Sequence, residues 1–132
     1  MNQITATLFP LLLALGQSAP ATAPKPQSLD DIALATAQKS LKATEKEVGP
    51  NHIAVAEILD SIAGMHQGKA KYALAEPLYV RNLTICERKF GPNSKQVAAR
   101  LSGLAVLYHN MGQAKKAVPL EKRALAINPR KK

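Results

Sequence analysis

Two consecutive stretches of the chain decide the fold: GPNHIAVAEILDSIAGMHQGKAKYALAEPLYVRNLTICERKF, residues 49–90, and GPNSKQVAARLSGLAVLYHNMGQAKKAVPLEKRALAINPRKK, residues 91–132. The two stretches align without a gap and are identical at 15 of 42 positions. A fixed period of this length is typical of helical units that stack one upon the next. The sequence therefore predicts two copies of one structural unit.

Each copy is expected to contain two helices. Apolar residues spaced by three and four predict a helix over about 53–67, a turn at 68–71 and a second helix from Tyr72. The second copy repeats this arrangement, with helices at about 94–110 and 113–128. Between the copies, Gly91-Pro92-Asn93 suits a helix end at the glycine, followed by a new start at Asn93 or Ser94.

A further helix is predicted over residues 29–48. Ser28 and Asp31 have the spacing of a capping box. Five residues form the expected inward stripe of this helix: Ile32, Ala37, Leu41, Thr44 and Val48. A shift of 42 places Leu41 on Leu83, so the helix is a half repeat that corresponds to the second helix of each copy.

The fold class that follows is all-α, an antiparallel helix-pair repeat (α-solenoid) of five helices. It spans residues 29–132, with a half repeat at 29–48 and repeats at about 49–90 and 91–132. Low aromatic content, at 4%, agrees with helix rather than strand. One cysteine excludes an intramolecular disulfide framework, and no apolar run reaches the ~18–20 residues of a membrane span.

The pattern resembles tetratricopeptide repeats of the 42-residue type found in kinesin light chains. The run Ala75-Glu76-Pro77-Leu78-Tyr79, with Arg81, Leu83 and the Gly-Pro-Asn linkers, carries the resemblance. The resemblance implies a scaffold or adaptor that binds a protein or peptide partner, without catalysis and without a cofactor.

The first residues predict a targeting segment. An apolar stretch from Ile4 to Leu15 precedes Ala19-Pro20-Ala21, the pattern of a signal peptide cleaved after Ala21. Residues 1–21 are then the signal peptide and 22–28 a Pro-rich linker, and the chain is expected to be exported, to the periplasm. The alternative is an apolar extension that remains attached.

A partner-binding groove is expected on the outward face of the first helix of each repeat. Its predicted residues are Glu57, Asp60, Ser61, Gln67, Ser102, Val106, His109 and Asn110. Polar positions of this kind suit an extended or helical peptide. The alternative interpretation is that they are only solvated, because two repeats make a short groove.

Positive charge is concentrated in the second half of the domain. Residues 1–87 carry a net charge of −1 and residues 88–132 carry +10. The predicted basic patch consists of Lys115, Lys116, Lys122, Arg123 and Arg130. The alternative function is therefore docking on anionic surfaces, a membrane included, while a solvated surface that keeps the protein soluble is the simpler interpretation. Nucleic acid is disfavoured, because aromatic residues are not interleaved with these charges.

Catalytic and metal chemistry find no support in the sequence. His52, His66 and His109 lack metal-ligand spacing with one another or with Cys86. His66 aligns with Tyr108 and is expected in the core, and Cys86 is expected to be a buried thiol. No catalytic motif is present, so no enzyme is predicted.

The C-terminal helix is expected to leave apolar surface uncovered. No helix follows 113–128, which exposes part of Val118, Leu125 and Ile127. Repeat stacks usually end in a helix with a polar outer face. This end is therefore predicted to pair with a partner or, by self-association through the C-terminal helix, with a second copy. The alternative interpretation is that the chain is a piece of a longer repeat array.

Overall fold

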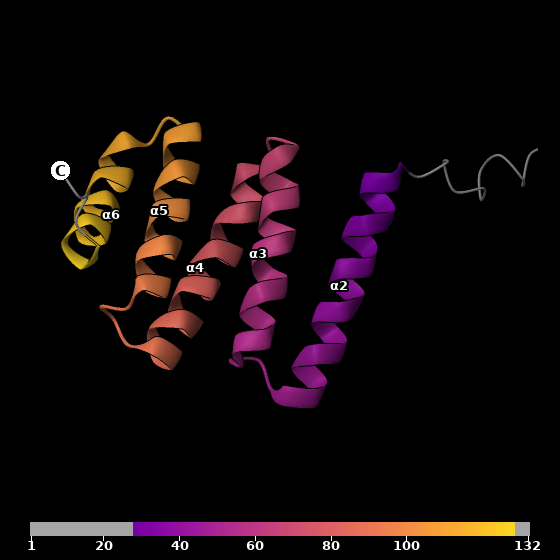
Figure 1. The fold of residues 1–132 in the computed structure, drawn as a ribbon. Coiled ribbons are helices and arrows are strands. Elements are labelled where there is room, and N and C mark those ends of the chain that lie inside the picture. Colours follow the sequence, from indigo (N-terminus) through magenta and orange to yellow (C-terminus); the bar gives the residue numbers. More distant parts are fainter. Residues whose placement is uncertain (1–27, 129–132) are drawn as a thin grey trace, which may run out of the picture.

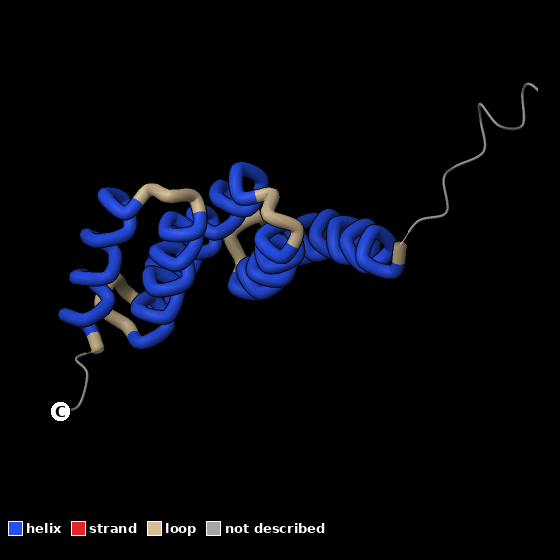
Figure 2. Tube along the Cα trace, turned by 90° about the horizontal axis from the view of Figure 1, so that it is seen from above, coloured by secondary structure: helices blue, strands red, loops and turns tan. Residues whose placement is uncertain are grey.

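The computed structural model describes residues 28–128, which form five helices and no strand. They are α2 (Leu29–Val48), α3 (Ile53–Gly68), α4 (Tyr72–Phe90), α5 (Lys95–Asn110) and α6 (Ala114–Ile127). The helices alternate in direction (Figure 1), and each one packs on its neighbours in the chain. Seen from above, they follow one another in a row (Figure 2). The all-α helix-pair repeat is confirmed, and the helix limits agree with the predicted ones to within one residue wherever both ends were predicted.

Some predictions lie outside these residues. The signal peptide at 1–21, the linker up to residue 27 and Arg130 fall in the parts of the chain that the structure does not describe.

Helix ends are set by side chains and by glycines. The Ser28 hydroxyl accepts a hydrogen bond from the Asp31 backbone N–H at 3.2 Å, and the Asp31 carboxylate accepts one from the Ser28 N–H at 3.4 Å, which confirms the capping box. Gly91 ends α4 with a φ of 88°, a conformation that L-residues rarely adopt. Ser94 then caps α5 by accepting from the Val97 N–H at 3.1 Å. His52 caps α3 in the same way, through Nδ1, which the sequence had not suggested.

The core follows the 42-residue period. Val55 and Leu59 of α3 are fully buried, as are Val97 and Leu101, their counterparts in α5. Ala75 of α4 is likewise fully buried. Small residues at such positions let neighbouring helices approach closely, and the apolar cluster is continuous from α3 to α6.

The helix α2 departs from the predicted packing. None of its residues is fully buried, and the expected inward residues Ile32 and Val48 are 48% and 44% exposed. The half-buried side is formed by Leu34, Ala37, Leu41, Thr44 and Glu45. The prediction was wrong at Ile32 and Val48 because α2 packs mainly against α3, and one main neighbour covers only a narrow stripe.

The final helix is incompletely covered, as predicted. Val118 and Leu125 of α6 are 40% and 43% exposed, whereas Ile127 is half-buried against the core. Within the described residues, none of the helices combines the length and apolar character needed to cross a membrane.

Candidate partner-binding groove

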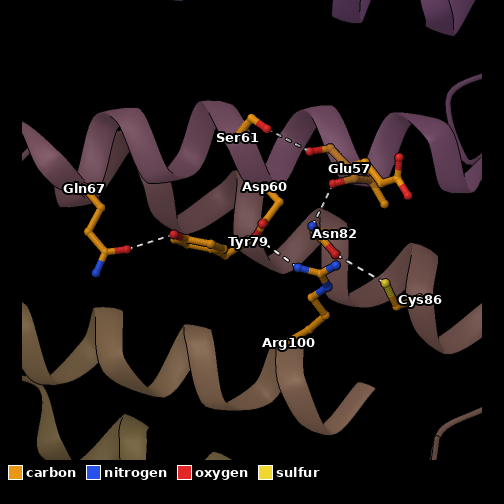
Figure 3. Close-up of polar contacts among 9 residues, drawn as sticks. Glu57, Asp60, Ser61, Gln67, Tyr79, Asn82, Cys86 and Arg100 are labelled. Atoms are coloured by element: carbon orange, nitrogen blue, oxygen red, sulfur yellow. Dashed lines mark hydrogen bonds and ion pairs between the residues drawn. The ribbon is translucent and has the colours of Figure 1, made fainter. Parts of the chain in front are cut away.

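The first half of the predicted groove lies on α3, where two of its residues make contacts between helices. The Asp60 carboxylate pairs with Arg100 of α5 at 3.2 Å. Gln67 accepts a hydrogen bond from the Tyr79 hydroxyl of α4 at 2.8 Å. Figure 3 shows both contacts on the same side of α3. Asp60 and Gln67 therefore help to hold α3 against the next two helices.

The electrostatics of this junction reflect partial burial. The pKa of Tyr79 is raised, first by loss of hydration and then by the nearby Asp60 carboxylate, while Arg100 acts in the opposite direction. Tyr79 is thus a neutral hydrogen-bond donor to Gln67. Neither Arg100 nor Tyr79 was predicted as part of this surface, because their proximity to Asp60 depends on how the helices pack.

Glu57 and Ser61 are exposed on the same helix and do not contact a neighbour through their side-chain polar atoms. The Ser61 hydroxyl donates to the backbone carbonyl of Glu57, one turn earlier, at 3.3 Å (Figure 3). Both side chains are accessible on α3, away from the hollow described next.

A hollow of about 500 Å³ lies between α5 and α6. It brings together two predicted groove residues, Ser102 and Val106, with Leu125 of α6, which the sequence predicted to be exposed, and with Glu121 of α6, which was not predicted as a groove residue. The α5–α6 hollow is lined by Lys95, Ala98, Ala99, Ser102, Val106, Glu121, Ala124, Leu125 and Asn128. Val106 is 52% exposed within it, so an apolar side chain is presented on an otherwise mixed surface.

The end of α5 is joined to α6 beside this hollow. His109 Nε2 lies 2.5 Å from the Glu121 carboxylate, and both side chains are nearly half exposed. Asn110, the last residue of α5, is exposed and does not line the hollow. Of the eight predicted groove residues, then, Ser102 and Val106 line the hollow and His109 lies at its edge through Glu121.

The basic patch divides into exposed lysines and one arginine with a structural contact. Lys115, Lys116 and Lys122 are exposed on α6, and the Lys116 ammonium lies 5.5 Å from the centre of the Tyr108 ring. Arg123 instead donates hydrogen bonds to the Glu87 carboxylate at 3.2 Å and to the Pro92 carbonyl at 3.1 Å. The three lysines are therefore the accessible charges of the patch among residues 28–128.

A second, smaller hollow of about 290 Å³ lies between α2 and α3, lined by Asp30, Ala33, Met65, Gly68 and Lys69. Next to it, Lys69 pairs with Asp31 at 2.8 Å. Hydrogen bonds from Lys69 and Ser28 lower the pKa of the Asp31 carboxyl. Unlike the α5–α6 hollow, the α2–α3 hollow is not lined by an exposed valine or leucine.

Two buried side chains of α4, Asn82 and Cys86, have hydrogen-bond partners within the fold. Asn82 of α4 is fully buried and donates to the Ala56 carbonyl of α3 at 2.7 Å (Figure 3). The Cys86 thiol donates to the Asn82 amide oxygen at 3.3 Å and is 1% exposed, as predicted. His66 is also buried, again as predicted, but its ring Nδ1 has no hydrogen-bond partner among the described residues, although a satisfied ring was expected. In the part of the chain described, no three His, Cys, Asp or Glu side chains are grouped to hold a metal ion.

A single row of antiparallel helices with a 42-residue period defines a helical-repeat protein. The comparison with known families is more specific, because the model of the tetratricopeptide repeat matches residues 55–130. The chain belongs to the tetratricopeptide repeat family. Repeats of this family generally mediate protein–protein interactions and are non-catalytic. No significant match was found among curated proteins.

Proposed function

We propose that the chain binds a protein or peptide partner in the α5–α6 hollow. The observation that supports this proposal is the exposure of Val106 and Leu125, at 52% and 43%, on the walls of one concave surface. Burial of partly exposed apolar side chains supplies affinity, and polar groups at the edges orient the ligand. Lys95 and Glu121 provide charges of both signs beside the apolar residues.

The expected affinity contribution of these side chains is moderate. Full burial of a valine or leucine stabilises a complex by about 1.5–3 kcal/mol, and both residues are already half covered. Each should therefore contribute on the order of 1 kcal/mol, or somewhat less than tenfold in affinity. The charged substitution Val106→Asp should weaken binding further, because it places an unpaired carboxylate in the contact.

The test is affinity capture with the full chain from a cell-envelope extract, followed by binding of the purified captured protein. A partner held by the parent chain and by Val80→Asp, but not by Val106→Asp, supports the proposal. Val80→Asp is a matched control, because Val80 is an exposed valine of α4 outside the hollow. Equal binding by the Val106→Asp chain contradicts it.

Electrostatic docking is the second candidate function, favoured by the exposure of Lys115, Lys116 and Lys122 on one helix. Its signature differs from that of groove binding. Binding to vesicles that contain anionic lipid should disappear with added salt and with substitution of the three lysines by glutamine. Val106→Asp should leave vesicle binding in place if docking alone operates.

A further inference from the structure

The structure contains an internal example of a helix packed against a repeat. α5 follows the pair α3 and α4 and packs against α4 (Figure 1). Its Tyr108 hydroxyl donates to Glu76 at 2.9 Å, and its Arg100 pairs with Asp60 at 3.2 Å. Leu83 of α4 is 8% exposed. These contacts show which residues of a repeat receive the helix that comes next.

The 42-residue period transfers this receiving surface to the second repeat. Asp60 and Glu76, which contact α5, correspond to Ser102 and Val118. Tyr79 and Leu83, which lie on α4 beside them, correspond to Glu121 and Leu125. Three of the four corresponding residues line the α5–α6 hollow: Ser102, Glu121 and Leu125. On the second repeat, the hollow therefore lies at the position that α5 fills on the first repeat.

We propose that the α5–α6 hollow receives one amphipathic, acidic α-helix of a partner protein, packed as α5 packs on α3 and α4. This inference rests on the proposed function, since it names the form of the partner at the same site. It extends the contact surface to Val118, which is 40% exposed on the outer side of α6.

A difference in sequence between the two repeats indicates where the partner helix carries apolar side chains. Where Glu76 accepts a hydrogen bond from Tyr108, the second repeat has Val118. A helix packed here meets Val118 and Leu125, which lie seven residues apart and so on one face of α6. It therefore presents apolar side chains at this point rather than a tyrosine hydroxyl.

The acidic character follows from the charges around the hollow. Lys122 lies one helical turn from both Val118 and Leu125, and Lys115 lies one turn before Val118. Lys95 lines the hollow itself. The acidic residue on these walls, Glu121, is paired with His109. Carboxylates on the partner helix would meet a positive surface, which favours association and orientation.

A second copy of the chain fits this surface poorly. Its α3 and α5 each pack against helices on both sides. α2 has an open side, but Ile32, Lys39 and Lys46 recur there at intervals of seven, and all three are exposed. Two lysines on that side would oppose those of α6. A second copy of the chain is therefore not the expected occupant of the hollow.

The probe is a labelled peptide with the sequence of residues 94–111, which already packs in the corresponding position. All versions carry Gly103→Ala for helix propensity and Tyr108→Leu to match Val118. The acidic version adds Lys95→Glu and Arg100→Glu, and the basic version keeps both cations. A third version adds Leu104→Pro to the acidic peptide, because proline inside a helix disrupts it.

Fluorescence anisotropy with the full chain should show binding of the acidic peptide and at least tenfold weaker binding of the basic and proline-containing peptides. Lys122→Glu in the chain should reduce binding of the acidic peptide, whereas Lys42→Glu, the same charge change on exposed α2, should not. Leu125→Ser should also reduce binding of the acidic peptide, and Leu125 is exposed enough for the fold to persist. Circular dichroism should confirm that all variants are folded.

Three outcomes would overturn the inference. They are absence of binding by the acidic peptide at millimolar concentration, equal binding of the proline-containing peptide, and a dimer in light scattering that the peptide displaces. The second outcome, together with a captured partner that depends on Val106, would leave the proposed function intact and assign an extended ligand to the hollow. A captured partner indifferent to Val106→Asp would instead contradict the proposed function itself.

Discussion

Arg123 of α6 forms an ion pair with Glu87 of α4 at 3.2 Å and donates a further hydrogen bond to the carbonyl of Pro92. The same two contacts occur one period earlier, where Arg81 binds the Glu45 carboxylate and the Pro50 carbonyl. In each case one guanidinium joins the second helix of a repeat to the second helix of the preceding unit and to the loop after it. This arrangement fixes the spacing of successive units.

The first prediction concerns this contact. Arg123→Met, which keeps most of the apolar stem, should lower the free energy of unfolding by about 1 kcal/mol, because a half-exposed ion pair and one hydrogen bond are lost. Urea denaturation of Arg123→Met, Glu87→Gln and the double variant measures the coupling. Lys122→Met, at an exposed neighbouring position, serves as the control. Strict additivity of the two single changes would show that the pair adds nothing.

The second prediction concerns Asn82. Asn82→Ala should lower the free energy of unfolding by about 2 kcal/mol, since the buried bond to the Ala56 carbonyl and the volume of the amide are both lost. Alanine itself is compatible with the repeat, because Ala124 occupies the corresponding position in α6. Thr84→Ala, which removes an exposed hydroxyl bonded to its own helix, should cost less than 0.5 kcal/mol in thermal or urea unfolding. Equal effects of the two changes would refute this role for Asn82.

The third prediction concerns pH. Burial lowers the pKa of His66, and the charges of Lys71 and Lys69 lower it further. The unfolded chain therefore takes up a proton near pH 6.5 that the folded chain does not, so stability falls as the pH drops through 6.5 towards the folded pKa and then levels off. His66 Nδ1 has no hydrogen-bond partner in the described structure, which agrees with a neutral ring.

His66→Tyr, the residue found at position 108, should remove this component. Urea denaturation of both proteins between pH 5 and 7.5 would show a shallower fall for the variant. Parallel curves would mean that other groups account for the dependence. The comparison uses slopes, so a constant difference in stability between the two proteins does not affect it.

The fourth prediction concerns export, which we propose from residues 1–21. Expression of the full chain in a Gram-negative host should yield periplasmic protein that begins at Thr22, because Ala19-Pro20-Ala21 suits cleavage after Ala21. Mass spectrometry of the purified protein should give the mass of residues 22–132. Ala21→Leu should block processing at this position, since the cleavage site requires a small residue. Recovery of unprocessed parent chain in the cytoplasm would contradict export.

Much of the fold could be predicted because it depends on local patterns repeated with one period. The capping residues Ser28 and Ser94, the glycine at position 91 and the apolar spacing in α3 and α5 act within one or two helical turns. The packing of α2 was harder to predict from the sequence. Ile32 and Val48 are expected inside by their spacing, but their burial requires packing on more than one side, and α2 packs mainly against α3.

The sequence by itself determined the period, the helix limits, the burial of His66 and Cys86, and the exposure of Val118 and Leu125 at the end of the row. Tertiary structure decided which polar residues remain available to a partner. It pairs Asp60 with Arg100 and Arg123 with Glu87, and it places Ser102 beside Leu125 in one hollow. The physical reason is that hydrogen-bond spacing and helix periodicity are properties of neighbouring residues. Side-chain pairing and concave surfaces arise only where separate helices meet.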